Sequence, residues 1–229
     1  MTAPVSISVR NVTQRFTAYN SSNEVVALTD VSLDVRAGEF CCLLGPSGCG
    51  KSTLLNIIGG LNAPTAGTVK VGETTITGPL PSQVAFVFQE STLFPWYTML
   101  ENFKVSNEFQ GGKGEWKDRA MAALRSVGME NFANHYPNQL SVGMKQRINL
   151  ARGIFLDTPI ILMDEPFAAL DEQTRMVLGE DLSILLARTG KGDPLAHPRL
   201  TVVGRMVKSA PGPEREALKA RFLYALLRV

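Results

Sequence analysis

Cysteine, histidine and blocks of like charge are scarce in this sequence of 229 residues. Its three cysteines, Cys41, Cys42 and Cys49, form no Cys-x-x-Cys pair. An odd number without metal-ligand spacing argues against a disulfide framework and predicts reduced thiols in a reducing compartment. The net charge is only +2, and no run of basic residues occurs. Nucleic acid is therefore not the expected partner.

Long apolar runs are also missing. No stretch approaches the roughly 18 consecutive apolar residues that a membrane-spanning helix needs. The first ten residues lack the basic start and apolar run of a secretory signal. Hydrophobic residues make up 45% and charged residues 19% of the chain, which is ordinary for a globular domain with a sizeable core. We expect a cytosolic protein, or one attached to a membrane through a partner.

Alternating and continuous apolar runs predict strands, and longer mixed stretches predict helices. Strands are expected at 5–12, 31–35, 40–44, 68–71, 84–88, 160–163 and 200–203. Helices are expected at 53–58, over most of 100–152 and at 172–186. Pro213 suits a first helical position, and apolar residues at 218, 222, 226 and 229 would then share one face of a terminal helix.

A glycine-rich loop joins the strand at 40–44 to the helix after it. Glycines permit backbone angles that other residues resist, so main-chain N–H groups close on phosphate oxygens. The positive end of the next helix faces the same anion. Lys51 is predicted to reach the β- and γ-phosphates, and the Ser52 hydroxyl to bind Mg²⁺. The loop fits G-x-x-x-x-G-K-[ST] at every fixed position, and its residues are Gly45, Pro46, Ser47, Gly48, Cys49, Gly50, Lys51 and Ser52, followed by Thr53.

Two acids end the apolar strand at 160–163. Asp164 is predicted to help hold Mg²⁺. Glu165, its neighbour, is predicted to polarise the attacking water as a general base. The alternative is a strand that simply ends in acids at a turn. Beside the phosphate loop, the pair favours a P-loop protein that binds and hydrolyses ATP.

The segment between these motifs resembles the ATP-binding subunit of ABC transporters. Gln89, in F-V-F-Q-E, looks like the family's glutamine loop, and L-S-V-G-M-K-Q-R at 140–147 looks like its signature motif. A-L-D at 169–171 looks like its aspartate loop, and the resemblance covers about residues 5–188. L-F-P-W-Y-T at 93–98 with L-E-N at 100–102 is similar to the subfamily that imports nitrate, sulfonates and taurine.

This resemblance implies that two subunits pair head to tail around ATP and Mg²⁺. Ser141 and Gly143 of one chain would contact the γ-phosphate held by the other, so closure would depend on the ligand. Gln89 would sense the metal, take part in catalysis and connect to the membrane subunits. Phe16 would stack on adenine, with Tyr19 as the alternative and plain core packing as the alternative for both.

Two departures from the family's pattern stand out. Val142 replaces the first of two glycines after the signature serine, and its β-branched side chain could crowd the phosphate or restrict the backbone. The family's switch histidine ends an apolar strand. His197 lies near the expected position, but prolines stand on both sides and no apolar strand precedes it. A loop histidine is the better interpretation.

From residue 192 the chain resembles a different family. D-P-L at 193–195, P-R-L-T at 198–201 and G-R at 204–205 look like a fragment of split-barrel flavin proteins related to pyridoxamine phosphate oxidase. The fragment is too short to build a flavin site. We therefore expect an ABC-type ATP-binding domain at 1–188, with a helical subdomain at about 90–155, and an atypical C-terminal segment at 189–229.

The sequence thus predicts an α/β P-loop NTPase with a mixed sheet core and an inserted helical subdomain. Its expected function is ATP hydrolysis that drives import of a small solute such as nitrate, sulfonate or taurine. The expected partners are transmembrane permease subunits, a second ATP-binding subunit of the same sequence and, indirectly, a solute-binding protein, at the cytoplasmic face of the inner membrane. The alternatives are a degenerate nucleotide-binding module without effective turnover, from a fused or truncated gene, and a flavin-binding protein.

Overall fold

The computed structural model describes residues 5–17, 24–112, 115–165, 201–205 and 223–226. Its helices are α1 (Lys51–Ile58), α2 (Met99–Phe109), α3 (Trp116–Ser126) and α4 (Val142–Phe155), with 3₁₀ turns at Glu130–Phe132 and Pro137–Gln139. Its strands are β1 (Ile7–Thr17), β2 (Glu24–Val35), β3 (Phe40–Leu44), β4 (Ala66–Val71), β5 (Thr74–Thr75), β6 (Val84–Val87), β7 (Ile160–Asp164), β8 (Thr201–Arg205) and β9 (Leu223–Leu226).

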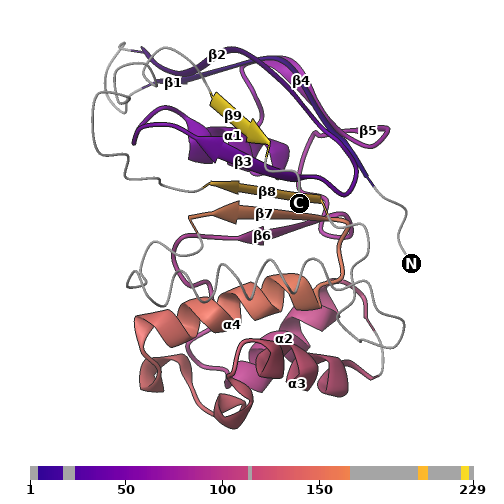
Figure 1. Ribbon diagram of the computed structural model, residues 1–229, viewed down its shortest axis with the longest axis vertical. Helices are drawn as coiled ribbons and strands as arrows, with labels where there is room; N and C mark the ends of the chain where they lie inside the picture. The colour runs from indigo at the N-terminus through magenta and orange to yellow at the C-terminus, as the bar shows by residue number, and fades with distance from the viewer. Residues whose placement is uncertain (1–4, 18–23, 113–114, 166–200, 206–222, 227–229) are drawn as a thin grey trace.

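These strands form two sheets (Figure 1). The four-stranded sheet has the order β2-β1-β4-β5, and its neighbouring strands are antiparallel. The five-stranded sheet has the order β6-β7-β8-β3-β9. Its first four strands are parallel, and β9 runs antiparallel to β3. The expected mixed sheet is therefore present, and it contains the strand that ends at the phosphate loop.

Strand β7 shows how the five-stranded sheet separates two hydrophobic cores. Its residues from Ile160 to Met163 are all buried, and successive side chains of a strand point to opposite faces. Ile160 and Leu162 pack with α1 and the four-stranded sheet, whereas Ile161 and Met163 pack with α2, α3 and α4. Figure 1 accordingly shows α1 between the two sheets and the other helices on the opposite face. A continuous apolar strand suits a sheet that is covered on both faces.

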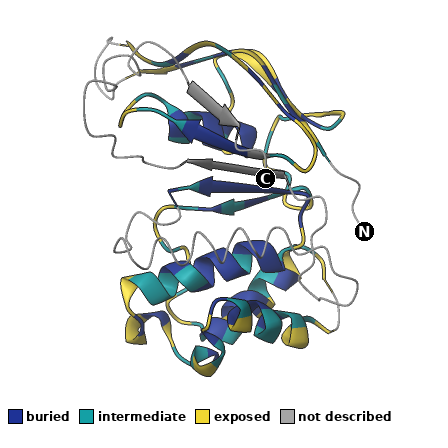
Figure 2. Ribbon diagram, in the orientation of Figure 1, coloured by how far each residue is buried: buried dark blue, intermediate teal, exposed yellow. Residues whose placement is uncertain are grey.

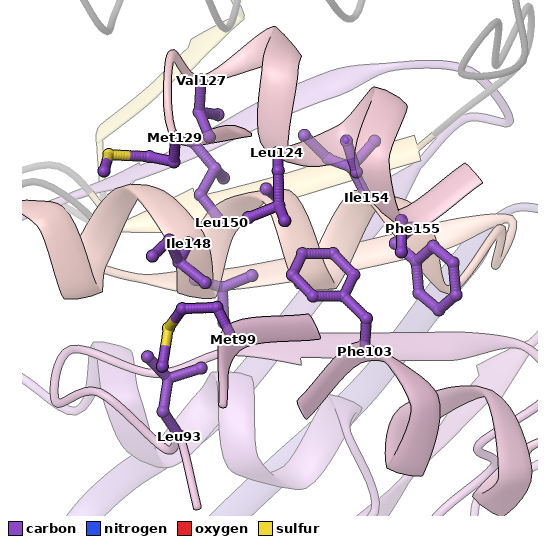
Figure 3. Packing of buried hydrophobic residues seen from close by; sticks show 14 of the residues in the cluster. Leu93, Met99, Phe103, Leu124, Val127, Met129, Ile148, Leu150, Ile154 and Phe155 are labelled. Atoms are coloured by element: carbon purple, nitrogen blue, oxygen red, sulfur yellow. The ribbon is translucent and has the colours of Figure 1, made fainter. Parts of the chain in front are cut away.

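The helices on that second face share one large apolar cluster. Phe103 of α2 meets Phe155 of α4 edge-on, with 5.2 Å between the ring centroids (Figure 3). Leu124 of α3 and Ile148 of α4 are fully buried in the same cluster. Figure 2 shows much of α4 in the colour of buried residues. Among the described helices, none is long and apolar enough to cross a bilayer.

The predicted terminal helix is wrong where the structure describes it. Leu223–Leu226 form β9, which pairs with β3. The run F-L-Y-A-L-L at 222–227 is continuously apolar, and such a run suits a buried strand as well as a helix. Without β9, the N–H and C=O groups along that edge of β3 would lack a strand partner. The helix predicted at 172–186 lies outside the described residues.

The strand predicted at 200–203 is present as β8, one residue shifted and two residues further extended. Both β8 and β9 come from the segment expected to be atypical, yet they pair with strands of the expected ATP-binding domain. A domain boundary at residue 188 stays a prediction.

Candidate nucleotide-binding site

Four parallel strands bring the predicted site residues to one edge of the five-stranded sheet. Leu43 of β3 and Asp164 of β7 both lie opposite Arg205 of β8 in the strand register. Val87, the last residue of β6, pairs with Met163. The phosphate loop, the two acids and Gln89 therefore all follow strand ends at about the same level. Because only β8 separates β3 from β7, the loop and the acids begin about 10 Å apart.

Two glycines give the phosphate loop a backbone that other residues resist. Gly48 and Gly50 have φ angles of 81° and 93°, in the left-handed region that favours glycine. A Cβ on Gly50 would also lie 2.5 Å from the carbonyl oxygen of Ala27 and 2.6 Å from Leu28. A Cβ on Gly48 would meet nothing within 4 Å. The loop is therefore pressed against β2 at Gly50 and open at Gly48.

The Lys51 side chain lies inside this loop. It is 2% exposed. Its Nζ donates to the carbonyl oxygens of Gly45 at 2.7 Å and Pro46 at 2.6 Å, and it lies 3.3 Å from Sγ of Cys49. The loop thus holds a positive charge at its centre, where a phosphate group would meet both the ammonium and the main-chain N–H groups.

Helix α1 begins directly after the loop. Gly50 is its N-cap residue, no side chain caps it, and its first turn has no acidic residue. A first turn without a side-chain cap suits an anion, because its N–H groups have no intrahelical partners. Ser52 and Thr53 are half-buried in this turn, whereas Pro46, Ser47 and Gly48 form an exposed rim.

Asp164 and Glu165 stand at the end of β7. Asp164 is half-buried, and Glu165 is only 8% exposed with a φ angle of 47°. Such an angle is uncommon outside glycine and is found at functional sites. The Ser52 hydroxyl, the Asp164 carboxylate and the Gln89 amide all offer oxygen atoms. Mg²⁺ prefers oxygen donors and often takes one or two carboxylates beside nucleotide phosphates, so these residues fit the ion.

Gln89 follows β6 and is exposed. The chain on both sides of it is held by α4. Gln146 contacts the residue before it, Phe88, and Arg152 contacts Thr92 after it. Sequence reasoning missed these contacts because they join polar residues without a motif. The only signal was a set of polar positions three apart, at 146, 149 and 152, in a helix with a buried apolar side.

The next turn, at residues 93–98, presents an exposed aromatic side chain. Asn102 is fully buried; its Oδ1 accepts from the amide of Phe94 at 2.7 Å, and its Nδ2 donates to the carbonyl of Thr98 at 2.9 Å. Thr98 and Glu101 form a capping box at the start of α2, and these hydrogen bonds lower the pKa of Glu101. The motif residues Glu101 and Asn102 thus shape the turn, and Trp96 is left 66% exposed.

The signature motif forms the start of α4. Ser141 is the N-cap, and its Oγ accepts from the amide of Met144 at 3.2 Å. Val142 is the first helical residue and is 58% exposed. Its branch therefore does not prevent the helical backbone, and only the expected crowding of a phosphate is left to test. Gly143 is half-buried in the same turn.

The signature residues do not reach the phosphate loop of their own chain. Helix α4 packs on β6, and β6 lies three strand positions from β3, about 14 Å away. Within the described residues, no hydrogen bond joins Ser141 or Gly143 to residues 45–53. A γ-phosphate bound in that loop would therefore contact a signature serine only if a second chain supplied that Ser141.

Phe16 lies in the four-stranded sheet beside the loop. It pairs with Val25 of β2 and is 41% exposed. Two residues further along β2, Ala27 contacts Gly50 of the phosphate loop. An exposed ring at this position can stack on a base, since every base presents a π-face. Tyr19, the alternative, lies outside the described residues, as do the aspartate loop at 169–171 and His197.

The position of β8 in the chain bears on the switch histidine. The sequence has two histidines, His135 and His197. Both precede β8, which ends at Arg205, and no histidine occurs in residues 206–229. The strand that lies between β7 and β3 is therefore not followed by a histidine within this sequence.

Comparisons with known proteins agree with this geometry. A family model described as ABC transporter matches residues 28–168. The taurine import ATP-binding protein of Roseobacter denitrificans is 39% identical over 228 residues, which cover 97% of this chain and 84% of that protein. The nitrate import ATP-binding protein of Synechocystis sp. is 45% identical over 159 residues, which cover 69% of this chain and 59% of that protein.

Two further matches concern a less characterised relative and a solved structure. An uncharacterised ABC transporter ATP-binding protein of Methanocaldococcus jannaschii is 45% identical over 179 residues, 78% of this chain and 66% of that protein. A dimeric ATP-binding cassette in a post-hydrolysis state with ADP and Pi is 34% identical and has a TM-score of 0.76 over 88% of each chain. The predicted family and fold are therefore confirmed. The alignment with the taurine protein also extends beyond residue 188, because it covers 97% of the chain.

Proposed function

This chain belongs to the ABC transporter family, and we propose that it is the ATP-binding subunit of an importer that takes up a small solute such as nitrate, a sulfonate or taurine. Hydrolysis of ATP drives the uptake through separate membrane subunits. The solute class is that named for the taurine and nitrate relatives. The subunit works at the cytoplasmic face of the inner membrane, to which the membrane subunits attach it.

One observation carries this proposal: the glycine-rich loop with its buried lysine and the two acids stand at the carboxyl ends of the parallel strands of one sheet. Loops at the carboxyl ends of parallel strands are the usual ligand sites of α/β folds. A triphosphate whose γ-phosphate lies near Lys51 would bring its terminal oxygens toward β7. The same edge then serves phosphate binding and water activation.

Each site residue has a separate role in ATP binding and hydrolysis. Lys51 exchanges its carbonyl acceptors for β- and γ-phosphate oxygens and holds their charge. Glu165, shielded from solvent, accepts the proton of the attacking water. Phe16 stacks on adenine and fixes the base. Ser52, Asp164 and Gln89 would hold Mg²⁺, which neutralises phosphate charge when bound. The chemistry rests mainly on positioning and electrostatics.

The proposed transporter contains two further kinds of subunit. A second ATP-binding subunit of the same sequence supplies Ser141 and Gly143 to the γ-phosphate, because those residues do not reach the loop of their own chain. Membrane permease subunits dock beside Gln89, where Trp96 offers an exposed aromatic side chain. Aromatic residues of this kind are enriched at protein interfaces. A solute-binding protein acts on the permease rather than on this chain.

The decisive test is phosphate release by purified protein with Mg²⁺ and ATP. We expect steady turnover by the wild type and a loss of about 100-fold or more in Glu165→Gln, as expected when a general base is removed. ATP binding should persist in that variant. Glu73→Gln is the matched control, because Glu73 is an exposed acid in the four-stranded sheet region. Equal turnover in Glu165→Gln and wild type would contradict the assigned base.

A binding module without turnover is the second candidate, and the missing histidine after β8 favours it. It predicts that the wild type retains ATP tightly with Mg²⁺ but releases no phosphate. In that case Lys51→Ala should still abolish retention, because the loop binds the triphosphate in both candidates. The flavin hypothesis predicts a yellow purified protein instead.

A further inference from the structure

Three polar side chains of α4 contact the segment that carries Gln89. Gln146 Nε2 donates to the carbonyl oxygen of Phe88 at 3.4 Å, one residue before Gln89. Arg152 Nη1 donates to the carbonyl oxygen of Thr92 at 3.0 Å, three residues after it, and Arg152 Nη2 donates to the Thr92 hydroxyl. Asn149 Oδ1 accepts from the same hydroxyl at 3.2 Å and from Arg152 Nη2 at 3.0 Å. Helix α4 therefore holds the chain on both sides of Gln89.

These contacts are made at a cost. All three acceptors of Arg152 are neutral oxygens, and burial lowers the pKa of Arg152 to about 10. No ion pair involves Arg152 within the part of the chain that the structure describes. Asn149 Nδ2 is buried without a hydrogen-bond partner there, and such a group costs about 1–3 kcal/mol. Arg152 thus gives up much of its hydration without gaining an ion pair, and a positional role explains why polar residues stand at this place.

Helix α4 is well suited to transmit position. Its amino end carries Ser141, and its far end lies close against β6, where a Cβ on Gly153 would come within 2.6 Å of Val87. Arg152 lies eleven residues from Ser141, about 16 Å along the helix. The buried side of α4 packs into the apolar cluster shown in Figure 3. A displacement of the Gln89 segment would therefore shift α4 as one rigid helix and displace its Ser141 end.

We propose that Arg152 is a positioning residue, which acts with Gln146 and Asn149 to fix the Gln89 segment to α4, so that the metal-side contact and the Ser141 end move together. The inference rests on the proposed function, since Gln89 matters only if it meets Mg²⁺ and ATP. It predicts that breaking the Arg152–Thr92 contact weakens the response to Mg²⁺ while the phosphate loop still binds ATP.

Thr92 offers the sharpest variants, because it is exposed and its hydroxyl can be removed or kept by small substitutions. Thr92→Val removes only the hydroxyl that Arg152 and Asn149 share, and Thr92→Ser keeps it. Arg152→Met removes the guanidinium with similar bulk. The matched control is Arg119→Met: Arg119 is also half-buried and donates to a carbonyl, that of Phe155, at 2.8 Å, but it does not touch the Gln89 segment.

Two readouts separate a positioning role from a structural one. The first is the Mg²⁺ concentration that gives half-maximal phosphate release, compared with the KM for ATP. We expect Arg152→Met to raise the Mg²⁺ midpoint about 10-fold, as removal of a partner that orients a metal ligand does, with little change in KM. Thr92→Val should shift it in the same direction by less, and Thr92→Ser and Arg119→Met should match the wild type.

The second readout does not need turnover. In a Trp116→Phe background, Trp96 is the single tryptophan, and it lies seven residues from Gln89. Its emission should change when Mg²⁺ is added to the ATP-bound protein. The change should be lost in Arg152→Met and kept in Arg119→Met.

The two proposals fail in different ways. A wild type that releases no phosphate overturns the ATPase, but its Trp96 response still tests the positioning role. Equal Mg²⁺ midpoints in Arg152→Met and Arg119→Met, with turnover intact, overturn the positioning role alone. A Trp96 emission that does not change on addition of Mg²⁺ in the Trp116→Phe background also overturns the positioning role. If Arg152→Met fails to fold, the comparison of Thr92→Val with Thr92→Ser decides, and equal midpoints in those two reject the inference.

Discussion

Two helices of this chain begin beside an expected phosphate, and they begin in different ways. Helix α1 starts from Gly50, which has a φ angle of 93° and no side-chain cap. Helix α4 starts from Ser141, whose hydroxyl caps the amide of Met144, and continues through Val142 with ordinary helical angles. The first start depends on a backbone that only glycine adopts easily. The second depends on a side chain, and many residues can follow a serine cap.

Substitutions at the two sites should therefore act on different steps. At the phosphate loop, the main chain itself is the binding surface, so a substitution acts on folding and binding together. At the signature motif, the helix forms in the single chain although a β-branched residue follows Ser141. A substitution there should act on the step at which a second chain closes over ATP.

Gly50→Ala should give the largest effect. It places a Cβ in the left-handed region, which costs about 1–2 kcal/mol, and brings that Cβ to 2.5 Å from the carbonyl of Ala27. The loop must shift, and ATP affinity should fall by about 100-fold or more, since each 1.4 kcal/mol is tenfold. Thermal unfolding and equilibrium ATP binding measure both consequences.

Gly48→Ala is the matched control for that prediction. Gly48 has a similar φ angle of 81°, but a Cβ there meets nothing within 4 Å. Gly48→Ala should therefore incur only the cost of placing a Cβ in the left-handed region, about 1–2 kcal/mol. If both variants lose ATP affinity equally, contact with β2 is not what positions the loop.

The phosphate loop was also the part of the site most readable from the sequence. Its conformation follows from local glycines at fixed spacing, and the strand before it is a short apolar run. The two acids at the end of β7 were also readable, because they directly follow a short apolar run. By contrast, β9 depends on pairing with β3 across about 180 residues of chain, and an apolar run does not reveal its partner.

The signature region was readable only in part. Resemblance pointed to Ser141 and Gly143, but not to Arg152 and Thr92, whose contact joins two segments 60 residues apart. Polar residues on a partly buried helix have many potential partners, and only the packing of α4 on β6 selects one. The close approach of Gly153 to Val87 likewise has no local signal.

Gly153→Ala tests how closely the far end of α4 is packed against β6. Alanine favours a helix by about 1 kcal/mol over glycine. However, its Cβ would lie 2.6 Å from a methyl of the fully buried Val87, and overpacking costs about 1–3 kcal/mol. We expect a net loss of about 1 kcal/mol in the free energy of unfolding, measured with urea.

A double-mutant cycle with Val87→Ala sharpens the result. If the two side chains compete for one space, the pair should be less destabilised than the sum of the single variants by about 1 kcal/mol. Additive losses would mean that α4 finds its place without this contact. At Gly153 the neighbouring atom belongs to the Val87 side chain, which can shift. At Gly50 the neighbouring atom is the main-chain carbonyl oxygen of Ala27, which cannot shift as easily. We therefore expect the smaller effect at Gly153.

Val142 should give the smallest effect on the single chain and a gain in activity. Because Val142 is exposed and helical, Val142→Gly should lower the free energy of unfolding by less than about 1 kcal/mol. Removing the branch opens the space expected for the partner's γ-phosphate, and phosphate release should rise about two- to fivefold, which is less than 1.36 kcal/mol of barrier.

Val142→Ala separates crowding from backbone freedom, since it removes the branch but adds no flexibility. Equal gains in both variants identify the side chain as the obstacle. A gain confined to Val142→Gly would mean that the signature start needs glycine's backbone after all, and the contrast with the phosphate loop would disappear.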